Sequence, residues 1–298
     1  MRSSIQAVLH AILFALAALI SLPAVASPGA RVAPGSFHDG SLATRNGSIQ
    51  IGEDAQVQGN INSRNGAVQA DQRSSGGDIE TRNGAITLGH EARFGRLDSR
   101  NGAINLGSGV QVTGIEARNG AVRIGADNRI SGPVETRNGA IEVATGAQIG
   151  GDVEARNGRI RLEPGVRVDG SVSSRNGKVS LEQASVGGSV SGRGGDIELM
   201  QASQVEGDLI IDAGSSSEQR GWFRWTRVSH AQAGDIHLRE GSTVLGDVII
   251  RLPQGYDRAL PTLWIDGSSS VLGRVIVDSR VQLQIDGEAL GGIERVSP

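Results

Sequence analysis

Arginine recurs along the chain at a nearly constant interval, and each copy is followed by asparagine and glycine. The interval is 18 or 19 residues, and the eight arginines are Arg45, Arg64, Arg82, Arg100, Arg118, Arg137, Arg156 and Arg175. Guanidinium groups in such a row could bind the repeating charges of a phosphorylated or acidic surface polymer. Anion binding is therefore the first chemistry that these residue types and their spacing suggest.

Acidic residues stand two positions before five of these arginines, on the same strand face: Glu80, Asp98, Glu116, Glu135 and Glu154. Arginines stacked about 4.8 Å apart would repel each other by roughly 1 kcal/mol per neighbour in water, and less in salt. Because an acidic column offsets this repulsion, a solvated, self-neutralised ladder is the alternative to an anion-binding stripe. Ala43, Asn62 and Ser173 replace the acids near the ends, so an anion site would favour the ends.

The sequence contains no recognisable catalytic or metal-binding constellation. After the N-terminal region, the histidines His38, His90, His230 and His237 lack the close spacing of a metal site, and the chain has no cysteine. Carboxylates could pair in space, as in solenoid enzymes that act on polysaccharides, but most stand at repeated outward positions that favour a solvated face. We predict that the protein is not an enzyme and uses no cofactor or metal. A polysaccharide-binding or polysaccharide-cleaving β-helix protein is the alternative.

The elements that carry these residues are short strands. Between successive arginines, aliphatic and polar residues alternate in three runs, for example Ile141 and Val143, then Ala147 and Ile149, then Val153. This pattern predicts an all-β fold, a single-stranded parallel β-helix (β-solenoid) with 18–19 residues and three short strands per coil. Asn-Gly also favours hairpins, so an antiparallel fold is the alternative. Nine copies in one register, counting the degenerate Arg193–Gly195, favour stacked coils.

The asparagines of the repeat should form one corner of every coil. Asparagine accepts left-handed backbone angles better than most residues, and glycine has no Cβ that could clash at a tight corner. Stacked asparagine side chains could also hydrogen-bond from coil to coil as a ladder. The predicted corner residues are Asn46, Asn65, Asn83, Asn101, Asn119, Asn138, Asn157 and Asn176.

The N-terminus has the features of an export signal. Arg2 is followed by the uncharged, mostly aliphatic stretch 7–22, and Ala24–Ala26 offers small residues for cleavage. We predict a signal peptide at 1–26 and a linker at 27–40, with a retained membrane anchor as the alternative. The mature protein would lie in the periplasm or on the surface of a bacterium, without a membrane span after signal cleavage. Cleavage removes one arginine and changes the formal net charge from −3 to −4, which does not suggest nucleic acid.

The C-terminal part interrupts the repeat. We expect regular Arg-Asn-Gly coils over 41–200 and a continued solenoid with inserted loops and a C-terminal cap over 201–298. The first insertion contains Trp222, Phe223 and Trp225 beside several arginines. These aromatic residues could cover the last coil or form a partner-binding loop for a cell-envelope glycan or protein. The N-terminal edge has no obvious cap, so weak end-to-end self-association is also expected.

Two motifs resemble known families. The unit Gly246–Ile250 and the pattern Ala147–Val153 resemble bactofilins, which are polymer-forming β-helical cytoskeletal proteins. The unit Asn83–Ile86 resembles secreted adhesin-type β-helix domains. Kinship with bactofilins would imply a right-handed β-helix and nucleotide-free, end-to-end polymers, although an export signal departs from a cytosolic location. The resulting expectation is an exported, non-enzymatic structural or adhesive protein of the cell envelope.

Overall fold

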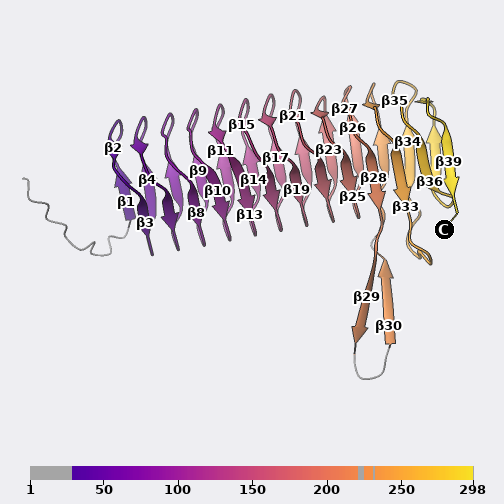
Figure 1. Cartoon of the computed structure of the whole chain (residues 1–298), viewed down its shortest axis with the longest axis horizontal. Coiled ribbons are helices and arrows are strands. Elements are labelled where there is room, and N and C mark those ends of the chain that lie inside the picture. The colour runs from indigo at the N-terminus through magenta and orange to yellow at the C-terminus, as the bar shows by residue number, and fades with distance from the viewer. Residues whose placement is uncertain (1–28, 221–224, 231, 298) are drawn as a thin grey trace, which may run out of the picture.

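The computed structural model describes residues 29–220, 225–230 and 232–297. In this part of the chain all regular structure is β, and the strands stack in parallel into a rod of thirteen coils (Figure 1). The β-solenoid fold predicted from the repeat is therefore confirmed. At about 4.8 Å per coil the rod is roughly 60 Å long. The described residues include no helix that is long and apolar enough to span a membrane.

The coils contribute to three sheets, taken here in chain order, and all but coils 3 and 4 provide a strand to each. The first sheet consists of β1 (Gly29–Val32), β4 (Ser48–Ile51), β7 (Val68–Ala70), β9 (Ile86–Leu88), β11 (Ile104–Leu106), β14 (Val122–Ile124), β17 (Ile141–Val143), β20 (Ile160–Leu162), β23 (Val179–Glu182), β26 (Ile197–Met200), β31 (Ile236–Leu238), β34 (Thr262–Ile265) and β37 (Gln282–Ile285).

The second sheet is narrower. It consists of β2 (Phe37–His38), β5 (Gln56–Val57), β12 (Gln111–Val112), β15 (Arg129–Ile130), β18 (Gln148–Ile149), β21 (Arg167–Val168), β24 (Ser185–Val186), β27 (Gln204–Val205), β32 (Thr243–Val244), β35 (Ser270–Val271) and β38 (Glu288–Ala289). In coils 3 and 4 only single bridging residues, Ser75 and Arg93, continue it.

The third sheet leads into the asparagine corner. It consists of β3 (Leu42–Thr44), β6 (Ile61–Ser63), β8 (Ile79–Thr81), β10 (Arg96–Ser99), β13 (Gly114–Ala117), β16 (Val134–Thr136), β19 (Val153–Ala155), β22 (Val172–Ser174), β25 (Val190–Gly192), β28 (Leu209–Asp212), β33 (Val248–Arg251), β36 (Val275–Asp278) and β39 (Ile293–Val296).

The core is a set of aliphatic columns that run through the rod. Ile141 and Val143 stack on Ile160 and Leu162 of the next coil, and all four are at most 1% exposed. Ala147, Ile149 and Val153, the other inward residues predicted for this coil, are equally buried. Because parallel register places equivalent residues above one another, each coil buries its apolar face only through its neighbours.

The difference between 18-residue and 19-residue coils lies mainly at the corner between the second and third sheets. Three successive coils are one residue shorter there, and these short corners lie at 77–78, 95–96 and 113–114. The core adjusts locally, since the ring of Phe94 fills space beside Gly76. A Cβ on Gly76 would lie 2.7 Å from Phe94 Cε1 and 3.0 Å from Ile61 Cδ1.

The asparagine corner forms the expected ladder. In every step Nδ2 of one asparagine donates to Oδ1 of the asparagine in the preceding coil, at 2.7–2.8 Å from Asn65 to Asn176. The left-handed backbone expected of the asparagines is not found, because neither these asparagines nor their glycines have positive φ. The steric reason for the glycines is confirmed. The glycines are needed because a Cβ there would overlap the carbonyl oxygen of the glycine one coil earlier, as at Gly102 over Gly84.

Left-handed backbone occurs instead at the corner between the first and second sheets. The residue with positive φ in this corner is glycine in some coils, such as Gly109 (φ 68°), and non-glycine in others, such as Glu91 (φ 56°) and Asp127 (φ 57°). Conformation therefore constrains this corner, whereas lack of space constrains the asparagine corner.

The solenoid begins earlier than the sequence suggested. From Gly29 onward the expected linker 27–40 is the first coil, because β1 pairs with β4 and β2 pairs with β5. A turn at Gly35 (φ 65°) joins the two strands, and this compact turn looked like a linker in the sequence. The predicted signal peptide 1–26 lies outside the described residues.

Two insertions interrupt the C-terminal coils without shifting their register. The first is an antiparallel hairpin of β29 (Ser215–Arg220) and β30 (Trp225–His230), which extends sideways from the rod after β28 (Figure 1). The second is the loop 252–261, where Tyr256 is buried and its hydroxyl accepts the backbone N–H of Ala233 at 2.8 Å. Neither insertion covers coil 13, so no described residues form the expected C-terminal cap.

Candidate functional site

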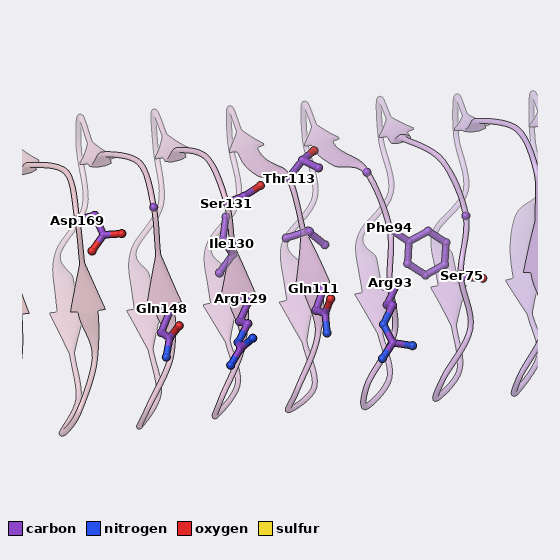
Figure 2. A pocket seen from close by; sticks show the side chains of 14 residues that line it. Ser75, Arg93, Phe94, Gln111, Thr113, Arg129, Ile130, Ser131, Gln148 and Asp169 are labelled. Carbon is purple, nitrogen blue, oxygen red and sulfur yellow. The ribbon is translucent and has the colours of Figure 1, made fainter.

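A groove of about 710 Å³ runs along the second sheet. One wall is a row of four polar side chains on consecutive coils, Arg93, Gln111, Arg129 and Gln148 (Figure 2). Thr113 and Ser131 line the opposite side. The row faces solvent because these residues hold the outward position of each short strand.

The groove begins where the coils are shortened. Its first part lies beside the corners 77–78, 95–96 and 113–114, and Gly95 and Thr113 line it. Each of these corners has one residue fewer than the same corner in the following coils. Buried Val112 and Ile130 lie beneath it, at most 4% exposed, and Phe94 is also among the lining residues. A shorter corner cannot bulge outward, so the surface is hollowed along the rod axis.

Some arginines of the groove form ion pairs and others do not. Arg167, one coil beyond Gln148, pairs with Asp169 at 3.0 Å, and Asp169 lines the end of the groove. By contrast, neither Arg93 nor Arg129 makes a side-chain hydrogen bond or ion pair with any described residue. The groove therefore presents two free guanidinium groups separated by two coils, about 10 Å.

The arginines of the repeat form a second positively charged feature. All eight are exposed, and within residues 29–220 none makes a side-chain hydrogen bond or an ion pair. The acidic column lies beside them in register, from Glu80 to Asp98 and Glu116. Glu116 pairs with Arg96 rather than with an arginine of the repeat. Any neutralisation between the two columns therefore acts through space, without direct contact.

Neighbouring carboxylates in the acidic column repel each other at Asp98. Partial burial, followed by repulsion from Glu116 and Glu80, raises the pKa of Asp98. A carboxyl group whose pKa is raised by folding stabilises the fold only when it is protonated. Ionised Asp98 therefore lowers stability at neutral pH, and the loss is reversed as the pH falls through the folded-state pKa.

This repulsion predicts that removing the charge of Asp98 stabilises the fold in a pH-dependent way. Asp98→Asn should raise the free energy of unfolding at pH 7 by about a few tenths of a kcal/mol, since the site is partly exposed and screened. The gain should shrink as the pH is lowered, because wild-type Asp98 then becomes protonated. Thermal melts from pH 7 to pH 4 measure both effects, with Asp39→Asn in coil 1 as the charge control. An equal gain at every pH would contradict the electrostatic explanation.

The sequence also contains a second repeated position whose structural role was not predicted. The residue before each repeat arginine is always serine, threonine or alanine. In coils 2 and 3 its buried hydroxyl donates to a corner glycine, from Ser63 to Gly66 O and from Thr81 to Gly84 O, both at 2.7 Å. These hydroxyls satisfy backbone carbonyls inside the corner.

The Gly-Asp pairs of the resemblance also have a structural role. Oδ1 of Asp152 accepts the backbone N–H of Ser171 in the next coil at 2.7 Å. Asp208 accepts the backbone N–H of Asp247 across the first insertion, and Asp247 accepts that of Arg274 across the second, both at 2.8 Å. A carboxylate at the start of the third sheet therefore ties one coil to the next.

A cluster on the first sheet links coils 9 to 12. Glu198, 9% exposed, pairs with Lys178 at 2.5 Å and with Arg239 at 3.4 Å. The guanidinium of Arg239 lies 4.5 Å from the ring centre of Trp264, which belongs to β34 and not to an inserted loop. Every charge in this cluster has a partner within it. The cluster is therefore best explained as a structural contact that holds together the coils on either side of the two insertions.

The predicted partner-binding loop is only partly described. Trp222 and Phe223 lie outside the described residues, and Trp225 opens β30, where it pairs with Arg220 across the hairpin. The binding loop therefore stays a prediction. In the comparisons with known proteins, no family model, no curated protein and no solved structure matches this chain.

Proposed function

We propose that this protein is an exported, non-enzymatic structural or adhesive component of a bacterial cell envelope, built as a rod that can self-associate. The observation that carries the proposal is the apolar surface of the last described coil, whose outer edge pairs with no described strand. The strands β37, β38 and β39 end their sheets, and Leu290, Ile293 and Val296 in this coil are 67%, 50% and 44% exposed.

The first coil has a related character. Phe37 in β2 is 64% exposed, and no described strand pairs with the outer edges of β1, β2 and β3. Exposed backbone at the end of a sheet is a ready template for another strand. Because apolar side chains accompany it at both ends, contact between rod ends removes both unpaired backbone and apolar surface from water.

The motifs that resemble bactofilins and secreted adhesin-type domains support the same function. The Gly-Asp units and the Asn-Gly units both belong to coil-to-coil contacts in this chain, as at Asp247 and Asn83. Such motifs support a shared way of building a rod. An export signal at 1–26 would direct that rod to the envelope rather than to the cytosol.

Self-association is tested by charging the last coil. The double variant Leu290→Lys/Ile293→Lys should weaken association at least about tenfold, since two charges would replace apolar surface that an end contact buries. Leu245→Lys, at a 37% exposed leucine two coils before the end, is the matched control and should behave as wild type. Light scattering of the mature chain across concentration measures the effect. A wild-type monomer at every accessible concentration would contradict end-to-end assembly.

The envelope role is tested separately. Fractionation of cells that express the full chain should recover the protein, shortened by about 26 residues, outside the cytoplasm. Recovery of the uncleaved chain in the cytoplasm would contradict export. Incubation of the mature protein with a panel of acidic glycans addresses the rival function, because release of shortened products would replace the structural proposal with an enzymatic one.

A further inference from the structure

We propose that the groove along the second sheet binds a linear acidic polysaccharide, with an acidic group on alternate sugars, lying parallel to the rod axis. The juxtaposition that carries this inference is the row Arg93, Gln111, Arg129 and Gln148 opposite Thr113 and Ser131 (Figure 2). It goes beyond the structural role proposed above and does not depend on self-association.

The cations in the groove are available to a ligand. Arg93 and Arg129 have no side-chain partner among the described residues, and both are exposed. A planar guanidinium presents two parallel N–H groups that match a carboxylate. The spacing of about 10 Å between these two groups therefore selects a chain whose acidic groups are not on every unit.

The residues between the cations suit a hydroxyl-rich chain. Gln111 and Gln148 alternate with the arginines and make no side-chain hydrogen bond within the described rod. Each carboxamide offers both donors and an acceptor, and the hydroxyls of Thr113 and Ser131 add more on the other side. Sugar hydroxyls need this mixture, whereas a ligand recognised only by charge would need more cations.

The shape of the groove requires an extended ligand. Its lining residues run from Ser75 in coil 3 to Asp169 in coil 8, along the stacking direction. Val112 and Ile130 form its floor between the polar rows and are themselves almost fully buried. At the far end the next cation in the row, Arg167, is neutralised by its ion pair with Asp169. The row of unpaired arginines therefore ends before coil 8.

Direct binding to the purified mature protein tests the proposal. The probe is a hyaluronan oligosaccharide, in which a carboxylate occurs on alternate sugars, and chitin oligosaccharide of equal length is its neutral counterpart. Isothermal titration should detect hyaluronan at low salt, with affinity falling as salt increases. Arg93→Gln/Arg129→Gln should weaken it at least about tenfold.

A matched control separates the groove from overall charge. Arg100→Gln/Arg137→Gln removes the same two charges from the repeat column, also two coils apart, and should leave hyaluronan binding within about twofold. Equal loss in both double variants, or loss only in the control, would overturn the groove assignment. Equal binding of chitin, or tighter binding of poly-glutamate than of hyaluronan, would overturn the acidic-glycan assignment. No detectable hyaluronan binding at low salt would also overturn it. None of these results bears on export or assembly.

Discussion

Replacing Gly102 by alanine is expected to lower the free energy of unfolding by more than about 3 kcal/mol. The new methyl group would overlap the carbonyl oxygen of Gly84 in the preceding coil. Neither residue can move away easily, since the asparagine ladder joins Asn83 to Asn101 at 2.8 Å beside them. Chemical denaturation followed by circular dichroism measures the loss.

The matched control is Gly109→Asn in the same coil. Gly109 has a φ of 68°, and the nearest atom to an added Cβ is Glu91 Cγ at 3.4 Å. Since Glu91 and Asp127 hold the same corner position with similar φ, a side chain fits there and the cost should stay near about 1 kcal/mol. A control as destabilising as Gly102→Ala would show that conformation, not space, governs both corners.

The second large effect is expected at Phe94. Phe94→Val should cost about 3 kcal/mol, because its ring fills the space left by Gly76 one coil earlier. Gly76→Val alone should also destabilise, by about 1–3 kcal/mol, since its side chain would meet the ring. Each change disturbs the same volume from opposite sides.

The double variant Gly76→Val/Phe94→Val should recover most of the loss. It would extend the column already formed by Val57 and Val112, both 4% exposed, through coils 3 and 4. The expected coupling energy is therefore at least about 2 kcal/mol in favour of the pair. Additive losses would mean that the ring does not fill the space beside Gly76.

The sequence predicts the coil architecture because the repeat registers every inward residue. Ile141, Val143 and Ile149 could be assigned to the core from alternation alone, and the asparagine column could be assigned to a corner. The lack of room for a Cβ at the corner glycines could be suggested in this way, but the atom that a Cβ would meet could not. The close approach between Gly102 and Gly84 depends on the distance between coils, and a pattern within one coil does not show which atoms meet there.

The groove was also beyond the sequence pattern. A missing residue between Val112 and Ile115 reveals where a corner varies, but not that successive short corners hollow one face. Likewise, the acidic residue beside each central arginine suggested compensation, while the structure pairs Glu116 with Arg96. Side-chain direction at a corner decides such contacts, and residue spacing does not determine it.

The insertion of the hairpin has a consequence for how the rod folds. Between regular coils, bonded residues are 18 or 19 positions apart, as from Asn101 to Asn83. Across the hairpin the separation becomes 39, from Asp235 to Asp196. Doubling a loop adds only about 0.6 kcal/mol of closure entropy, so each coil can dock on the one already formed even there. Folding can therefore propagate coil by coil from one end, and a coil junction can carry an appended element at little cost to the rod.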